Sequence, residues 1–289
     1  MNVWVQGARP RTLPAAVVPV LVGTACAAGA RAGGIVWWRA IAAMVVALAI
    51  QVATNYVNDY ADGVRGTDDR RVGPVRLVGS GLATADAVKR AAALAGLVAV
   101  LAGLALTAAV GPELLVVGAA SLAAGYLYTG GPAPYGYLGL GELFVFTFFG
   151  VVATAGSAYV QLDDVMGLAL AASVPVGCLA TALLVVNNLR DIPTDAAAGK
   201  RTLAVRMGDG ATRALYVALV IAAFAALPVL ALRRPWALAA LAAIPLAVVP
   251  LRRIASGTSG RDLVAVLGDT GRLQLVYGAL LASGLALSA

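Results

Sequence analysis

The sequence contains no histidine, few charged residues and only two cysteines. The absence of histidine removes the commonest general base and the commonest ligand of transition metals. Charged residues make up 12% of the 289 positions, whereas an ordinary soluble domain carries about 25%. Cys26 and Cys178 lie inside apolar runs, which favours two packed thiols over a disulfide or a metal site. The composition is therefore not that of a soluble protein built around histidine or cysteine chemistry.

Long apolar runs dominate what is present. The chain is 61% hydrophobic and has a mean hydropathy of +0.89. Runs of about 17–25 apolar residues recur along it, and each is long enough to cross a bilayer as a helix. We therefore expect an all-α integral membrane protein that forms a single polytopic domain over residues 1–289. The nine expected spans cover residues 13–30, 37–58, 85–110, 113–129, 138–160, 164–188, 212–232, 235–250 and 270–288.

The positive charges are distributed unevenly between the two ends of these spans. All of the 21 lysines and arginines except Arg31, Arg39, Arg233 and Arg234 lie in the N-terminal segment or after the second, sixth and eighth spans. The positive-inside rule places those segments in the cytoplasm. We expect a multi-pass protein of the bacterial plasma membrane with a cytoplasmic N-terminus. The net charge of +7 is then a topology signal, and we expect no nucleic-acid partner.

A first polar cluster follows the second apolar run and includes the stretch NDYADGVRGTDDRR. Asn55, Asp59 and Asp62 are spaced i, i+4 and i+7, so they share one face of a helix. Asp68 follows after two glycines, where the chain can turn back. The cluster therefore gathers carboxylate and amide oxygens at the cytoplasmic end of a membrane helix.

A second polar cluster, NNLRDIPTD, ends the sixth apolar run in much the same way. Asn187, Asp191 and Asp195 are spaced i, i+4 and i+8 on one helix face. Because Pro193 has no amide hydrogen to donate, we expect the helix to kink or end there. A Gly-Lys-Arg triplet comes next. The same arrangement of apolar helix, spaced Asn and Asp, glycine and basic residues thus occurs twice.

Several carboxylates at one membrane boundary repel each other unless a cation holds them together. Hard oxygen ligands without histidine or thiolate suit Mg²⁺, which binds one or two carboxylates and completes its shell with water and substrate phosphate. The neighbouring basic side chains can then pair with phosphate oxygens. We predict a site for Mg²⁺ and a diphosphate with a long apolar tail. The alternatives are solvated helix ends that serve only topology, and the ion path of a cation transporter or channel.

The two clusters resemble those of the UbiA-type membrane prenyltransferases. The stretches that carry the resemblance are NDYADGVRGTD and NNLRDIPTDAAAGKRTLAVRMG. ARPRTLPAAVVPVLVGTA, GPVRLVGSG, YTGGPAPYGYLGLGELFVFTFFG and TGRLQLVYG are similar, more narrowly, to members that prenylate 1,4-dihydroxy-2-naphthoate in menaquinone biosynthesis. The resemblance covers nearly the whole chain. It implies nine transmembrane helices around a central cavity, with Mg²⁺ as cofactor and a prenyl diphosphate as donor.

The resemblance also implies roles for individual residues. The expected metal ligands are Asp59, Asp62, Asp68, Asp191 and Asp195, and all of these except Asp68 are expected to be catalytic. The expected substrate-binding residues are Asn55, Asn58, Arg65, Tyr128, Asn187, Lys200 and Arg201.

One stretch departs from the pattern of relatives that act on other aromatic acids. Those relatives often have a lysine four residues after a tyrosine, whereas Tyr128 is followed four places later by Pro132. This difference weakens the assignment of Tyr128 and disfavours 4-hydroxybenzoate as acceptor, whereas the stretches GPVRLVGSG and GKRTLAVRMG favour 1,4-dihydroxy-2-naphthoate. Homogentisate and 4-hydroxybenzoate stay as alternative acceptors, and Tyr128 has an alternative role as an anchor at the membrane interface.

The expected reaction begins with loss of diphosphate from the allylic carbon, assisted by Mg²⁺ and basic side chains. The electron-rich ring then attacks the prenyl cation, and loss of CO₂ restores aromaticity without a strong base. Demethylmenaquinol is the expected product. The last basic segment, residues 252–272, is expected to be a loop that either covers the site or only connects two spans.

Overall fold

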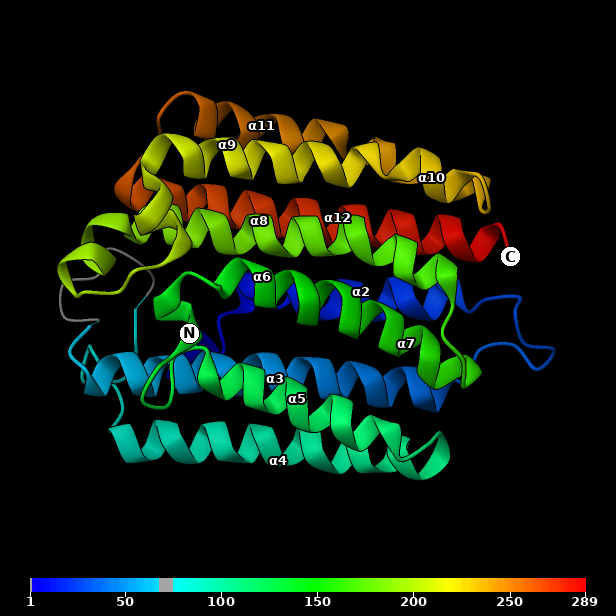
Figure 1. Cartoon of the computed structure of the whole chain (residues 1–289), viewed down its shortest axis with the longest axis horizontal. Helices are drawn as coiled ribbons and strands as arrows, with labels where there is room; N and C mark the ends of the chain where they lie inside the picture. Colours follow the sequence, from blue (N-terminus) through cyan, green and yellow to red (C-terminus); the bar gives the residue numbers. More distant parts are fainter. Residues whose placement is uncertain (1, 68–74) are drawn as a thin grey trace.

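The computed structural model describes residues 2–67 and 75–289, and within these it contains helices and no strands. Figure 1 shows the long helices lying side by side along the long axis of the molecule. Asp68 lies outside the described residues. The elements, in chain order, are α1 Val3–Gly7, η1 Pro10–Thr12, α2 Pro14–Cys26, α3 Trp37–Val64, α4 Ala85–Ala109, α5 Glu113–Leu127, η2 Tyr135–Leu138, α6 Gly141–Val145, η3 Phe146–Val152, α7 Ala153–Leu162, α8 Gly167–Ala197, α9 Leu203–Ala225, α10 Leu227–Ala231, η4 Pro235–Ala243, α11 Ile244–Ala255, η5 Gly260–Asp262 and α12 Leu263–Leu287.

The prediction of an all-helical, multi-pass membrane protein is confirmed. Six helices of the described chain are long and apolar enough to cross a membrane. The apolar helices α2 and α5 are shorter, so the number nine stays a prediction. The six candidate spans are Trp37–Val64, Ala85–Ala109, Gly141–Leu162, Gly167–Ala197, Leu203–Ala231 and Pro235–Ala255.

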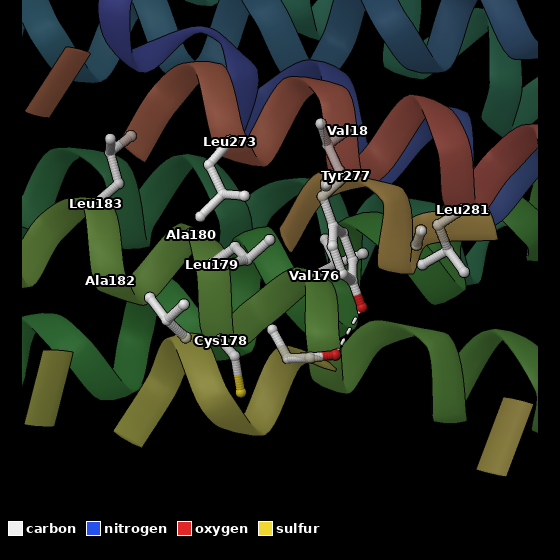
Figure 2. Close-up of a cluster of buried hydrophobic side chains, with 14 of the residues drawn as sticks. Val18, Val176, Cys178, Leu179, Ala180, Ala182, Leu183, Leu273, Tyr277 and Leu281 are labelled. Atoms are coloured by element: carbon white, nitrogen blue, oxygen red, sulfur yellow. Dashed lines mark hydrogen bonds between the residues drawn. The ribbon is translucent and has the colours of Figure 1, made fainter. Parts of the chain in front are cut away.

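The central helix is α8, because 78% of its most apolar stretch is buried, against 17–33% for the other five candidate spans. It packs against α9, α12, α2 and the π-helical segment η3. Figure 2 shows part of this core, where Val18 of α2 and Leu273, Tyr277 and Leu281 of α12 lie beside α8. The Tyr277 hydroxyl donates to the Ala223 carbonyl oxygen at 2.6 Å, which satisfies a buried polar group inside this apolar core.

Both α3 and α8 extend beyond the C-terminal ends of their predicted spans, and the described aspartates of the two clusters lie in these extra turns. Their C-terminal ends lie at the same end of the molecule (Figure 1). Of the two outcomes expected at Pro193, a kink or the end of the helix, the second is wrong, because α8 continues to Ala197. Pro193 removes one backbone hydrogen bond from the helix. The helical hydrogen bonding continues in the next turn, where the Ala198 amide donates to the Thr194 carbonyl oxygen at 3.0 Å.

The expected loop over residues 252–272 is largely helical. Helix α11 continues to Ala255 and α12 begins at Leu263, so only a short connection containing η5 joins them. Leu267, within α12, lines the central cavity. The prediction of a long basic loop in this region is therefore wrong. The basic residues at its start, Arg252 and Arg253, lie instead in the last turn of α11, where they oppose the negative end of the helix dipole.

Candidate active site

A cavity between α2, α3, α5, α8 and the α6–η3–α7 segment has apolar walls and one polar end. Residues of several helices form the apolar part, among them Val20, Val46, Ile50, Leu106 and Leu114. The polar end is lined by Arg9, Thr12, Gln51, Asn55, Asn58, Asp62, Arg76, Thr129, Asn187, Asn188, Asp191, Asp195 and Lys200. Such a cavity can hold a molecule with a charged head and a long apolar body.

The two polar clusters face this one cavity. Asn55, Asn58 and Asp62 reach it from α3, and Asn187, Asp191 and Asp195 reach it from α8. The Lys200 ammonium lies between the clusters, 3.6 Å from Asp62 Oδ2 and 3.9 Å from Asp195 Oδ1. The Lys200 amide also donates to the Asp195 carbonyl oxygen at 2.8 Å, which fixes the chain just after α8. Residues far apart in the sequence thus form one charged site.

Arg190 is a buried partner of the second cluster that the sequence analysis did not single out. Its guanidinium donates to both carboxylate oxygens of Asp191 at 2.7 Å. It also donates to Asn187 Oδ1 at 2.7 Å. Because arginine stays charged and presents several fixed donors, it can hold two neighbouring side chains at once. The spacing of Asn187 and Arg190, three residues apart on a helix, is the signal that could have identified it.

Asp59 makes a different contact from the one expected of it. Its carboxylate is fully buried and accepts the amides of Leu77 and Val78, both at 2.9 Å. It is not among the residues that line the cavity, whereas Arg76, directly before Leu77, is. The Asp59 carboxylate therefore anchors the segment that carries Arg76. Arg76 belongs to the GPVRLVGSG stretch but was not predicted as a site residue.

Asn55 joins the cavity to the N-terminal segment. Its amide donates to the Ala8 carbonyl oxygen at 3.0 Å, and the Arg9 guanidinium donates to the Asn55 carbonyl oxygen at 3.2 Å. Arg9 also lines the cavity and has a left-handed backbone, with φ of 54°. This basic residue was missed, although it lies in the ARPRT stretch.

The other expected basic residues lie outside the cavity lining. The Arg65 guanidinium donates to the carbonyl oxygens of Thr129 and Gly131, which ties α3 to the loop after α5. Arg201 is exposed, and its carbonyl oxygen accepts from the Arg206 side chain at 3.1 Å. Of the three predicted basic ligands, only Lys200 lines the cavity.

Two tyrosines of the loop region contact the site. The Tyr137 hydroxyl donates to Asp62 Oδ1 at 2.7 Å, and the Lys200 ammonium lies 5.0 Å from the centre of the Tyr137 ring. Burial, with a smaller contribution from Asp62, raises the pKa of Tyr137 to about 12. Tyr128 lines the cavity and packs edge-on against Tyr135.

The donors at the polar end suit a hard divalent cation. Within residues 2–67 and 75–289, no three acidic, histidine or cysteine side chains are gathered closely enough to form a metal centre by themselves. The carboxylates of Asp62, Asp191 and Asp195 nevertheless face one cavity. Mg²⁺ needs only one or two carboxylates when water and substrate phosphate complete its shell. The described residues therefore fit Mg²⁺ that is bound together with a phosphorylated substrate.

Comparisons with known proteins identify the class of membrane protein. The model of the UbiA prenyltransferase family matches residues 16–284. A 1,4-dihydroxy-2-naphthoate octaprenyltransferase of Mycobacterium tuberculosis is 52% identical, over 98% of this chain and 96% of that one. The enzyme of the same name from Escherichia coli is 35% identical, over 87% of this chain and 84% of its own. The chain therefore belongs to the UbiA prenyltransferase family.

Solved structures show the same fold at low sequence identity. A UbiA homolog from Archaeoglobus fulgidus bound to GPP and Mg²⁺ aligns with a TM-score of 0.69 at 14% identity, over 96% of this chain and 99% of that one. A digeranylgeranylglyceryl phosphate synthase aligns with a TM-score of 0.64 at 14% identity, over 98% of both chains. The expected UbiA-like fold is thereby confirmed.

Proposed function

We propose that the protein transfers a polyprenyl group from a prenyl diphosphate to 1,4-dihydroxy-2-naphthoate, with release of diphosphate and CO₂, to give demethylmenaquinol. The observation that carries this proposal is one cavity with two aspartate clusters at one end and apolar walls beyond them. That shape matches a diphosphate head and a prenyl tail. Relatives named for this naphthoate reaction, 52% and 48% identical over nearly the whole chain, support the acceptor.

The proposed metal ligands are Asp62, Asp191 and Asp195, together with Asp68 outside the described residues. We leave Asp59 out of this set, because it does not line the cavity and both its oxygens accept backbone amides of the chain. Mg²⁺, when bound, would neutralise part of the charge that develops on the leaving diphosphate. UbiA homologs solved with Mg²⁺ and a prenyl diphosphate support this choice of cofactor and donor.

The chain's own residues bind, orient and shield the reactants. Lys200, Arg9 and Arg76 line the polar end and offer cationic donors to the diphosphate oxygens. Asn58 and Asn187 add neutral donors there. The apolar walls exclude water that would otherwise quench the prenyl cation. Ring attack at the carboxylate-bearing carbon followed by loss of CO₂ needs no strong base, in keeping with a chain that lacks histidine.

We further propose that the whole chain is a single membrane domain and that the polar end of the cavity faces the cytoplasm. The polar C-terminal ends of α3 and α8 lie at the same end of the molecule (Figure 1). In the sequence, most of the lysines and arginines lie in the N-terminal segment or after the second, sixth and eighth predicted spans. The positive-inside rule assigns that end to the cytoplasm of a bacterial plasma membrane.

The function is tested with purified protein in detergent, 1,4-dihydroxy-2-naphthoate, a long-chain prenyl diphosphate and Mg²⁺, with mass spectrometry of the products. We expect a prenylated product without the carboxylate, and no product with EDTA. Prenylation of 4-hydroxybenzoate or homogentisate in its place would overturn the acceptor but not the reaction class. If no acceptor is prenylated and the protein instead carries cations into vesicles, these results would support a cation transporter.

A further inference from the structure

Two adjacent asparagines of α8, Asn187 and Asn188, line the cavity but are held by opposite kinds of partner. Arg190 donates to Asn187 Oδ1 at 2.7 Å, whereas Asn188 Nδ2 donates to Glu142 Oε1 at 2.9 Å. The Arg190 guanidinium can only donate, and Glu142 Oε1 accepts from Asn188 Nδ2, so these two bonds set the orientation of each amide. Asn187 is left with its NH₂ group to offer, and Asn188 with its carbonyl oxygen.

Glu142 has no role in the site as described so far. It lies in the first turn of α6, and only 7% of its surface is exposed. Within the described chain its Oε2 is buried and makes no hydrogen bond, whereas its Oε1 accepts the bond from the Asn188 side chain. Burying a carboxylate with so few hydrogen-bond partners costs free energy, so we look for a role of Glu142 beyond packing. Its contact with a cavity-lining amide indicates what that role is.

Aromatic side chains line the same cavity as Asn188. Phe144, two residues after Glu142, stacks on Tyr135 with ring centres 3.9 Å apart. Phe148 continues this row, 6.0 Å from Phe144. Tyr128 completes the group, and Gly141 packs so closely that a Cβ there would lie 3.1 Å from the Tyr128 ring. A flat aromatic molecule can pack against these rings while a polar group on its edge reaches an amide.

The free carbonyl oxygen of Asn188 decides which substrate group this side chain can bind. Diphosphate oxygens only accept hydrogen bonds, and the donors for them are Lys200, Arg9, Arg76 and the Asn187 amide. An amide carbonyl oxygen is itself an acceptor, so it cannot bond such a group and repels it. It suits a hydroxyl donor, and the proposed aromatic acceptor carries two hydroxyls. The cavity therefore separates donors for the diphosphate from an acceptor for a phenol.

Resting on the proposed function, we propose that Asn188 is a specificity-determining residue that accepts a hydrogen bond from a ring hydroxyl of the aromatic substrate. Glu142 is the positioning residue that fixes the Asn188 amide in the accepting orientation. A site built to bond a hydroxyl discriminates against an analogue that lacks it, since its buried polar group is then left unpaired.

The test is the ratio of affinities for 1,4-dihydroxy-2-naphthoate and 2-naphthoate, measured without oxygen on protein loaded with Mg²⁺ and farnesyl thiolodiphosphate. We expect the wild type to prefer the dihydroxy compound by about tenfold, the size of one hydrogen bond. Asn188→Ala and Glu142→Ala should lose this preference. Glu142→Gln should keep it, because its amide oxygen can still accept from Asn188. This rescue by the conservative variant separates positioning from a general loss of folding.

Asn187→Ala is the matched control. It should weaken binding of the thiolodiphosphate and leave the naphthoate ratio unchanged. A wild-type ratio near one, or an unchanged ratio in Asn188→Ala, would overturn the inference even if the enzyme turns over. If the protein prenylates 4-hydroxybenzoate instead, the proposed acceptor falls, and the same ratio is measured for 4-hydroxybenzoate against benzoate. Loss of that ratio in Asn188→Ala supports the inference, and its retention refutes it.

Discussion

The Lys200 ammonium lies 3.6 Å from Asp62 Oδ2 on α3 and 3.9 Å from Asp195 Oδ1 on α8. One buried cation thus joins two helices whose carboxylates would otherwise repel each other across the cavity. Breaking a buried charge pair by removing one partner leaves the other charge uncompensated, which is strongly destabilising. We interpret Lys200 as the group that holds the clusters together when no metal is bound, and that pairs with diphosphate when substrate is present.

Replacing Lys200 with methionine should therefore have two effects. The value of kcat/KM should fall by about a hundredfold, as for other lost electrostatic contacts to a transition state. Without Mg²⁺ the variant should also melt at a lower temperature, and added Mg²⁺ should restore more of its stability than it adds to the wild type. Thermal unfolding in detergent with and without Mg²⁺ measures this. Lys89→Met removes the same charge from α4, outside the cavity, and should change neither quantity.

Asp59 and Asp62 should behave differently when each is changed to asparagine. The Asp59 carboxylate accepts two backbone amides, so an asparagine there would direct its NH₂ group at an amide hydrogen. We expect Asp59→Asn to lower the free energy of unfolding by about 1–3 kcal/mol, the cost of an unsatisfied buried group. Asp62→Asn leaves Lys200 beside the Asp195 carboxylate, so it should lower the melting temperature less than Asp59→Asn does, and it should lower turnover by at least about a hundredfold. Equal melting temperatures for both variants would contradict the anchoring role of Asp59.

Tyr137 gives a prediction for alkaline pH. Its pKa is raised from 10.0 to about 12, mainly by burial and then by Asp62. Because the folded-state pKa lies above the unfolded one, the stability it contributes is fully present below pH 10 and is lost as the pH rises through 12. The wild type should lose more stability than Tyr137→Phe between these values, measured as the change in melting temperature. Between pH 6 and 9 the two pH–rate profiles should have the same shape, since the hydroxyl stays protonated throughout.

The same hydroxyl contacts Asp62, so Tyr137→Phe also tests the proposed metal site. Groups that orient a metal ligand typically change metal affinity by about 10–100-fold when removed. We expect the Mg²⁺ concentration for half-maximal turnover to rise within that range. If the Mg²⁺ concentration for half-maximal turnover is unchanged, the Tyr137 hydroxyl does not orient Asp62 as a metal ligand.

Local spacing predicted the part of the site that lies on single helices. Asn187, Asp191 and Asp195 share a face of α8 and line the cavity together. On α3 the same rule grouped Asp59 with Asn55 and Asp62, but the structure directs Asp59 to a different partner. The reason is tertiary, because the amides that Asp59 accepts belong to Leu77 and Val78, 18 and 19 residues later. Helical periodicity carries no information about such a segment.

Contacts between helices were the part that the sequence could not supply. Glu142 and Asn188 are 46 residues apart, and they meet only because α6 packs on α8. Arg9 and Arg76 lie in segments that resemble the family, yet nothing in their spacing indicates that they reach the cavity. The all-helical membrane fold, in contrast, follows directly from runs of apolar residues long enough to span a bilayer.

The close approach of η3 to α8 leads to the last prediction. A Cβ on Gly150 would lie 2.6 Å from the Cα of Gly177, so the two backbones touch where the π-helical segment crosses α8. Gly150→Ala must push these elements apart, and forced overpacking of this kind costs about 1–3 kcal/mol. The melting temperature should therefore fall. Gly96→Ala on α4, where a Cβ meets nothing within 4 Å, should leave it unchanged or raise it slightly.

Gly150→Ala should also weaken binding of the aromatic substrate more than binding of the prenyl diphosphate. Because η3 continues directly from α6, moving it away from α8 displaces Glu142 from Asn188. We expect Gly150→Ala to raise the KM for the naphthoate several-fold more than the KM for the prenyl diphosphate, measured by varying each substrate in turn. An equal rise in both values would mean that the displacement spreads through the whole cavity. A lower melting temperature with both KM values unchanged would mean that α6 keeps its place on α8 independently of the Gly150–Gly177 contact.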